Sequence, residues 1–266
     1  EFVETVYNIS GSFGGINLED IAAPRCFEIE RKLKERCDIP IFHDDQHGTA
    51  VIVLAGLINA LKIVGKKPED VKIVSSGAGA AGTAIAKLLI SYGFKNIIIC
   101  DRKGAIASDM EGLNWAKQEL AAITNPEKLH GTLADVIKGA DVFLGTSAPN
   151  IVSKEMVASM ADKAIVFPMA NPVPEIMPDV AKAAGARVIG TGRICLVEEK
   201  NEKIIGLNAL MKQTTGKADW QYSDTEAFLS MPPSNIIIHI LTDISQERQF
   251  IIHIKISIVH IISNTD

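Results

Sequence analysis

The feature that most constrains this chain is a glycine-rich turn between a short apolar run and a helix-forming segment. VKIVSS, at residues 71–76, has the composition of a buried strand, GAGAAG comes next, and helix-forming residues continue to about Tyr92. The turn matches the GxGxxG pattern at Gly77, Gly79 and Gly82. In this pattern the first glycine permits a tight turn, the second lets a pyrophosphate approach the backbone, and the third lets helix and strand pack closely. The sequence therefore predicts a dinucleotide-binding turn.

The neighbouring elements extend this prediction. The helix expected to begin at about Ala80 offers free N–H groups and a positive dipole end to phosphates. NIIICD is typical of a second strand and ends in Asp101, 24 residues after Gly77. A carboxylate there accepts hydrogen bonds from ribose hydroxyls and repels a 2′-phosphate, which favours NAD. Arg102 and Lys103 follow directly and either could face a 2′-phosphate, so NADP stays open, as does a glycine turn with an incidental aspartate.

Short apolar runs alternate with helix-forming segments through the rest of this region. The runs are DVFLGTS at 141–147, AIVFPMA at 164–170 and RVIGTG at 187–192, and helices are expected at about 113–123, 133–138, 153–160 and 178–184. This alternation predicts an α/β fold: a Rossmann-like, doubly wound parallel sheet with helices on both faces and right-handed crossovers. Ser147 follows one of these strands and is expected either to neighbour the cofactor or only to cap its loop.

The chain is expected to have three parts. Residues 1–46 form a small remnant of a preceding domain, residues 47–193 form the NAD-binding domain, and residues 194–266 form a divergent, irregular tail whose native folding is left open. The last 36 residues contain 12 Ile, and FIIHIKISIVHII has the profile of an aggregation-prone strand. A helix with few charges is expected from about Thr49 to Val64, and its apolar character predicts burial on most sides.

Two pairs of adjacent acids follow short apolar runs near the N-terminus. Glu19 and Asp20 end the segment INLED, and Asp44 and Asp45 follow IPIF and a histidine. Two such pairs brought together would repel each other without a cation, and hard divalent ions such as Mg²⁺ or Mn²⁺ prefer carboxylate oxygens. Spacing alone does not distinguish a metal site from two unrelated, solvated strand ends. The histidines that flank the second pair are expected to be loop residues rather than ligands.

The segment that contains both acid pairs resembles the signature region of bacterial-type, NAD-dependent malic enzymes. At 13–50 it reads FGGINLEDIAAPRCFEIERKLKERCDIPIFHDDQHGTA. The dinucleotide unit and VFPMANPVPEI at 166–176 continue the resemblance, which covers about residues 10–193 and is most specific over 13–60. It implies metal-assisted oxidative decarboxylation of malate to pyruvate and CO₂ with reduction of NAD.

The resemblance also implies roles for particular residues. Glu19, Asp20 and Asp45 match the family's divalent-metal ligands. Asp44 matches an acid that helps to place a catalytic lysine, and Thr49 falls in the stretch that reaches the cofactor. A bound cation would stabilise the negative charge that develops on the carbonyl oxygen as CO₂ leaves, which makes the implied ligand set chemically coherent.

Other parts of the family pattern are less complete. Asn171, in ANPVPE, matches an asparagine that contacts the substrate near the nicotinamide; without the resemblance it would be interpreted as a turn residue before Pro172. The family's general base Lys and general acid Tyr come from a segment upstream of the metal ligands that this chain does not match, and Tyr7 is not expected to replace the acid. We therefore expect this chain to be incomplete for catalysis, with a non-catalytic NAD- and metal-binding fragment as the alternative.

Composition argues against several other classes. The formal net charge of −5 is unlike that of a nucleic-acid-binding protein. No run of 18 uncharged apolar residues occurs, so no membrane span is expected. Four cysteines without a CxxC pair favour reduced thiols and a cytoplasmic location. Malate and pyruvate are the expected small-molecule partners, the resemblance implies a homo-oligomer, and another Rossmann-fold dehydrogenase is the alternative that the acid pairs disfavour.

Overall fold

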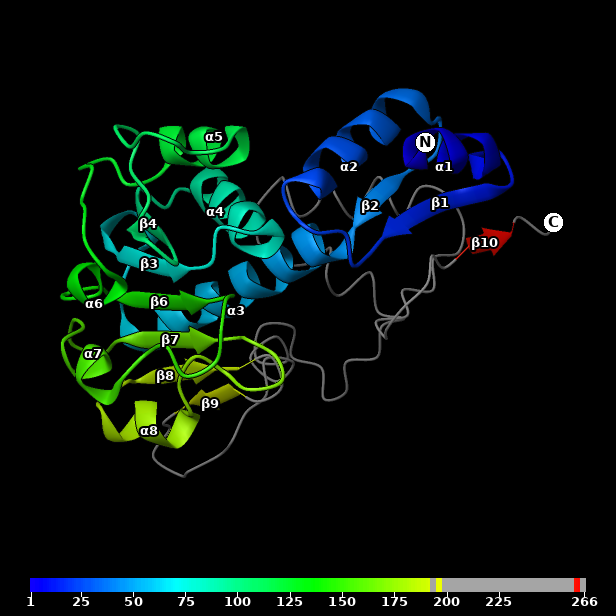
Figure 1. Cartoon of the computed structure of the whole chain (residues 1–266). Helices are drawn as coiled ribbons and strands as arrows, with labels where there is room; N and C mark the ends of the chain where they lie inside the picture. Colours follow the sequence, from blue (N-terminus) through cyan, green and yellow to red (C-terminus); the bar gives the residue numbers. More distant parts are fainter. Residues whose placement is uncertain (192–194, 198–260, 264–266) are drawn as a thin grey trace.

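A computed structural model describes residues 1–191, 195–197 and 261–263, which form two β-sheets (Figure 1). The larger sheet has the order β5-β4-β3-β6-β7-β8-β9. Its strands are β3 (Lys72–Ser76), β4 (Asn96–Asp101), β5 (Gly104–Ala105), β6 (Val142–Gly145), β7 (Ile165–Pro168), β8 (Val188–Gly190) and β9 (Cys195–Val197).

The strand order of the larger sheet confirms the doubly wound prediction. β4, β3, β6, β7 and β8 run parallel, and from β3 the chain passes first to β4 on one side and then to β6 on the other. The edge strands β5 and β9 are antiparallel to their neighbours, so the sheet is not wholly parallel. The connection from Asp101 to Gly104 is too short for a crossover and permits only a hairpin, in which Gly104 adopts a φ of +115°.

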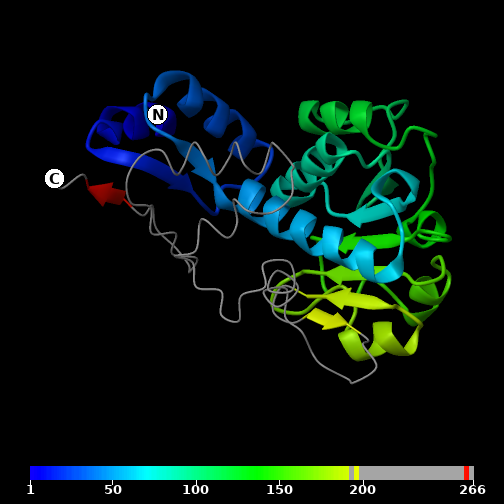
Figure 2. The same ribbon diagram turned by 180° about the vertical axis from the view of Figure 1, so that it is seen from behind.

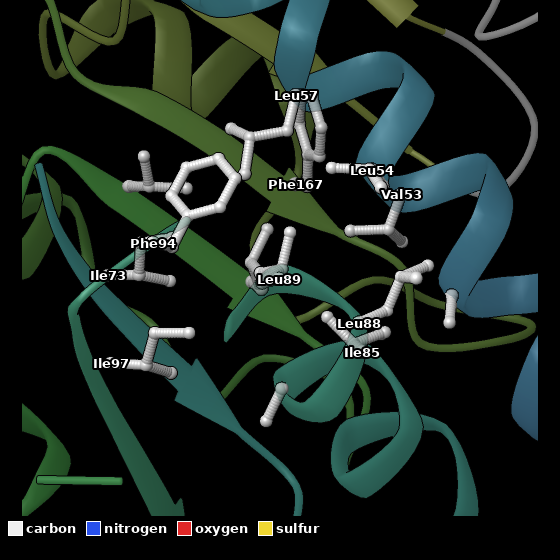
Figure 3. Packing of buried hydrophobic residues seen from close by; sticks show 14 of the residues in the cluster. Val53, Leu54, Leu57, Ile73, Ile85, Leu88, Leu89, Phe94, Ile97 and Phe167 are labelled. Carbon is white, nitrogen blue, oxygen red and sulfur yellow. The ribbon is translucent and has the colours of Figure 1, made fainter. Parts of the chain in front are cut away.

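Helices cover both faces of this sheet, as predicted (Figures 1 and 2). Successive side chains of a strand point to opposite faces, so Ile73 joins one buried cluster and Val74 joins the other. Figure 3 shows the first cluster, where Leu57 lies beside Phe167 of β7. Its helices are α3 (Thr49–Val64), α4 (Ala80–Tyr92) and α5 (Trp115–Ile123), and those of the opposite face are α6 (Leu133–Val136), α7 (Lys154–Ala158) and α8 (Pro178–Ala183).

α3 has the predicted bounds and is buried over most of its length. With the preceding π-helical turn η1 (Asp44–Gly48) it makes a helix of 21 residues, in which an 18-residue stretch has a mean hydropathy of 1.7. By length and composition alone this helix could cross a membrane, but 61% of that stretch is buried inside the protein. Its packing against the sheet and α4 is that of a core helix.

The smaller sheet combines two strands from the N-terminal part of the chain with one strand near its C-terminal end. β1 (Phe13–Leu18) pairs in parallel with β2 (Ile41–His43) and antiparallel with β10 (Ile261–Ser263). α1 (Phe2–Ser10) and α2 (Arg25–Arg36) pack beside these strands. The core of this unit consists of Val6, Ile16, Leu18, Ile29, Leu33 and Ile41. All six residues precede residue 46, and the division between residues 1–46 and 47–193 stays a prediction.

The predicted tail at 194–266 enters the described structure only as β9 and β10. Of the aggregation-prone segment at 250–262, only Ile261 and Ile262 are described, as part of β10, and the remaining expectations for the tail lie outside the described residues. Cys26, Cys37 and Cys100 are free thiols, as expected, and the side chain of Cys195 is not among those described.

Candidate dinucleotide and metal site

The glycine turn after β3 has tight packing at its first and third glycines. Gly77 has a φ of +123°, and a Cβ added there would lie 2.5 Å from Thr146 Oγ1. A Cβ on Gly82 would lie 1.9 Å from the carbonyl oxygen of Gly77. A Cβ on Gly79 would meet nothing within 4 Å. Side chains are therefore excluded by the protein itself at two positions, whereas open space beside the second suits an approaching pyrophosphate.

The first turn of α4 presents the phosphate-binding groups that the sequence predicts. The helix begins at Ala80 with Gly79 as its N-cap, and no side chain of Gly79 is there to accept from its first N–H groups. Those N–H groups and the positive end of the helix dipole lie directly after the turn. The arrangement is suited to a pyrophosphate between Gly77 and α4.

Asp101 ends β4, beside the strand that leads to the glycine turn, and its carboxylate is already bound by protein. Lys117 Nζ lies 2.5 Å from Oδ2, and the N–H of Lys103 donates to Oδ1 at 2.7 Å. Burial alone would raise the pKa of this carboxyl, but the hydrogen bonds from Lys117 and Lys103 outweigh it and the pKa is lowered. Asp101 is therefore held as a carboxylate, with a lysine ammonium against it.

The loop after β6 is tied to the end of β3. Thr146 donates from its backbone N–H to the carbonyl of Ser76 at 2.8 Å, and Ser147 Oγ lies 2.8 Å from Ser76 Oγ. Ser147 thus links two strands rather than capping the next helix, whose N-cap is Ser153. Its position beside the turn agrees with the predicted cofactor neighbour, although its contact with a cofactor stays a prediction.

Thr49 and Asn171, two other residues that the sequence predicts for the site, lie at the start of a helix and in a loop. Thr49 is the half-buried first residue of α3, and the preceding turn η1 packs against α4. Asn171 is exposed in the loop that follows β7. Its role as a substrate contact stays a prediction, and so does its alternative as a turn residue.

The two acid pairs lie together, because β1 and β2 are adjacent and parallel. Leu18 is in register with His43, so Glu19 and Asp20 leave one strand beside the residues that leave the other. The N–H of Asp20, in the left-handed conformation with a φ of +56°, donates to Asp45 Oδ2 at 2.8 Å. The interpretation as unrelated strand ends is therefore wrong in its geometry: the pairs converge.

Asp44 is a half-buried member of this group of acids. Burial, and then the negative charges of Glu19 and Asp45, raise the pKa of its carboxyl. Its side chain folds back on the turn, so that a Cβ on Gly48 would lie 2.2 Å from Asp44 Oδ1. A glycine at that position lets the carboxylate lie against the backbone of η1.

The chemistry of this acid group fits a divalent cation. In the described part of the chain no lysine or arginine forms an ion pair with Glu19, Asp20 or Asp44. Also within that part, no group of three or more His, Cys, Asp or Glu side chains is arranged to hold a metal ion. The four carboxylates offer oxygen donors of the kind that a hard divalent cation prefers, and metal binding by them stays a prediction.

The two histidines that flank the second acid pair, His43 and His47, lie against other parts of the protein. His43 is fully buried at the end of β2, and neither ring nitrogen has a hydrogen-bond partner within the described chain. His47 Nε2 lies 2.6 Å from Glu30 Oε1. Glu30 and Lys117, like the buried Glu175 after β7, were not identified from the sequence, because isolated charged residues carry no local pattern that reveals a partner distant along the chain.

Fold and site together define a dinucleotide-binding α/β domain joined to a small sheet that carries acidic side chains at the ends of its parallel strands. Comparisons with known proteins agree. Residues 46–193 match the family described as malic enzyme, NAD binding domain, and residues 1–34 match malic enzyme, N-terminal domain.

Individual relatives give the same result. An NAD-dependent malic enzyme of Geobacillus stearothermophilus is 59% identical over 73% of this chain and 40% of its own length. An NADP-dependent malic enzyme of Halomonas elongata is 52% identical over 72% of this chain and 45% of its own length. The crystal structure of an NAD-dependent malic enzyme from Thermotoga maritima is 37% identical, covers 91% of this chain and 69% of that one, and superposes with a TM-score of 0.72. This chain belongs to the malic enzyme family. It spans less than half the length of the Geobacillus and Halomonas enzymes.

Proposed function

We propose that this chain carries the NAD- and metal-binding part of a malic enzyme, which oxidises and decarboxylates malate to pyruvate and CO₂. The observation that carries the proposal is the convergence of the two acid pairs at the end of β1 and β2, with η1 packed against α4. Figures 1 and 2 both show the carboxyl ends of β1 and β2 directed toward the larger sheet, whose parallel strands end toward them. A substrate between these ends would meet both sites.

The residues of the chain divide the work by their chemistry. Glu19, Asp20 and Asp45 would hold Mg²⁺ or Mn²⁺, and Asp44 beside them would help to place a catalytic lysine. A cation held there would supply positive charge beside the substrate oxygens, which favours deprotonation of the malate hydroxyl and the departure of CO₂. Asn171 would orient the substrate from the loop after β7.

The dinucleotide would be held by a separate set of residues. Gly77, Gly79, Ala80 and Gly82 would receive the pyrophosphate at α4, and Ser147 and Thr49 would border the nicotinamide half. NAD bound there would supply the hydride acceptor for oxidation at C2 of malate.

NAD rather than NADP remains the proposed cofactor. Asp101 offers a carboxylate to ribose hydroxyls, which is unfavourable for a 2′-phosphate, and the relatives include both NAD- and NADP-dependent enzymes. Lys117 partly neutralises Asp101 and moderates that repulsion. The ion pair of Asp101 with Lys117 therefore predicts a partial, not an absolute, preference for NAD over NADP.

We expect the whole protein to be a cytoplasmic homo-oligomer that binds malate and releases pyruvate. Bacterial malic enzymes among the relatives support the substrate class. The acidic net charge disfavours a nucleic-acid partner, and the burial of α3 is that of a core helix rather than of a membrane-spanning one.

Isothermal titration of the whole chain with NAD and with NADP, with and without Mn²⁺, tests the proposal. We expect NAD to bind more tightly than NADP, and Mn²⁺ to strengthen NAD binding. Asp45→Ala should remove the Mn²⁺-dependent part and leave the metal-free part, because the glycine turn is untouched. Absence of NAD binding, or an unchanged Mn²⁺ effect in Asp45→Ala, would overturn the proposal.

A further inference from the structure

Glu175 is a fully buried acid at which two loops of the larger sheet meet. Its Oε1 accepts from the N–H of Ser147 at 2.9 Å, and its Oε2 accepts from the N–H of Ala170 at 3.0 Å. Ser147 lies in the loop after β6, and Ala170 lies in the loop after β7. One carboxylate therefore holds the backbones of both loops, and no lysine or arginine forms an ion pair with it in the described chain.

The last residue of β6 is shaped to admit this carboxylate. A Cβ added to Gly145 would lie 2.3 Å from the carboxyl carbon of Glu175 and 2.4 Å from its Oε2. The φ of Gly145 is not in the left-handed region, so a side chain is excluded there by space and not by backbone conformation. Gly145 and the carboxylate of Glu175 therefore pack directly against each other.

The loops that Glu175 joins carry two predicted site residues. Ser147 connects through its hydroxyl to Ser76, the residue directly before Gly77 of the dinucleotide turn. Ala170 directly precedes Asn171. β6 and β7 are adjacent and parallel, so both loops leave the same edge of the sheet (Figure 1). β3 and β6 also flank the point where the strand order reverses, which is where dinucleotides bind in such sheets.

We propose that Glu175 is a positioning residue that fixes Ser147 and the Asn171 loop against the nicotinamide half of the bound dinucleotide. The inference rests on the proposed function, because it requires that NAD occupies this edge. A carboxylate that accepts two backbone N–H bonds is satisfied only while both loops keep their places, and an unsatisfied buried donor is costly. In the described chain the Glu175 carboxylate bonds to Ser147 and Ala170 and to none of the three turn glycines, so its effect should fall on the nicotinamide half.

The test compares NAD with ADP-ribose, which has the same atoms except the nicotinamide. Glu175→Gln keeps the shape but cannot accept both N–H bonds, because one carboxylate oxygen becomes an NH₂ donor. We expect NAD affinity to fall about tenfold while ADP-ribose affinity stays within about twofold. Glu155→Gln, an exposed acid on α7, is the matched control and should change neither affinity.

A second variant approaches the same contact from the other side. Gly145→Ala keeps Glu175 but places a methyl group where its carboxylate lies, so the same selective loss of NAD affinity is expected. NAD affinity unchanged in Glu175→Gln, or equal losses of NAD and ADP-ribose affinity in both variants, would overturn the positioning role. If the wild-type chain binds ADP-ribose and not NAD, this proposal fails; if it binds neither ligand, the proposed function fails first.

Discussion

At the scale of single residues, the three glycines of the dinucleotide turn do different work. A side chain at Gly82 collides with the carbonyl of Gly77, whereas a side chain at Gly79 meets only open space. Gly82 is therefore required by the fold itself. Gly79 is required only if a pyrophosphate lies against the backbone.

Two alanine variants separate these roles. Gly82→Ala should lower the free energy of unfolding by about 1–3 kcal/mol, because the methyl group overpacks a fixed contact. Gly79→Ala should change that free energy by less than about 1 kcal/mol and weaken NAD binding by about tenfold or more. Urea unfolding and NAD titration measure the two effects.

Gly11→Ala is the control for both variants, because a Cβ on Gly11 also meets nothing within 4 Å and its φ is −62°. It should leave stability and NAD affinity close to those of the wild type. A Gly79→Ala protein with full NAD affinity would contradict the assignment of the turn.

The sequence predicted residues whose role depends on neighbours along the chain, and missed those whose role depends on distant partners. Gly77, Gly82 and Asp101 follow from a local pattern between strand and helix. Lys117 reaches Asp101 from a helix 16 residues further on, and Glu175 depends on two loops folding together. Nothing beside either residue in the sequence indicates these contacts.

At the scale of elements, the junction of α2 with η1 depends on Glu30. Its carboxylate accepts from Lys34 Nζ at 2.8 Å and lies 2.6 Å from His47 Nε2, and Gln46 Nε2 donates to its other oxygen at 3.1 Å. Burial alone would raise the pKa of Glu30, but the bonds and charges of His47 and Lys34 outweigh it and lower the pKa from 4.5 to about 2. The contact fixes the turn that carries Asp44.

Glu30→Gln tests this junction through its pH dependence. A carboxyl with a lowered pKa stabilises the fold above its unfolded pKa of about 4.5, and that stabilisation disappears as the pH falls through about 2. We expect Glu30→Gln to lower the free energy of unfolding at pH 7 by roughly 2–3 kcal/mol, with the difference from wild type shrinking below about pH 4.5. Urea unfolding over this pH range gives the measurement.

Glu28→Gln is the matched control on the same helix. Glu28 pairs with Lys32 four residues on, but both side chains are about half exposed, so solvent screens the pair. No measurable loss is expected. Equal losses in Glu28→Gln and Glu30→Gln would show that the buried junction has no special role.

The elements of the larger sheet were predicted better than their edges. β4, α3 and the end of α4 at Tyr92 lie where the apolar runs and turn residues put them, because each is long enough to show its own pattern. β5 has only two residues, and β9 lies in the segment predicted to be an irregular tail. Strands as short as these edge strands have no length or composition pattern by which the sequence could predict them.

At the scale of the whole molecule, two sheets direct the ends of their parallel strands toward each other. β1 and β2 present the acid pairs, and β3 and β6 present the glycine turn and the Ser147 loop (Figures 1 and 2). The continuous helix of η1 and α3 joins the two units, so the position of Asp44 and Asp45 is set by packing on the dinucleotide domain. The sequence alone placed each pair at a strand end, but only the pairing of β1 with β2 brings them together.

Binding of Mn²⁺, followed by the loss of the free-ion EPR signal, tests this convergence most directly. The double variant Asp20→Ala/Asp45→Ala should bind Mn²⁺ roughly 100-fold more weakly than the wild type, because it loses donors from both strand ends. Glu69→Ala/Asp70→Ala removes another adjacent, exposed acid pair and should bind as the wild type does. Mn²⁺ affinity that survives the loss of both Asp20 and Asp45 would contradict the metal site.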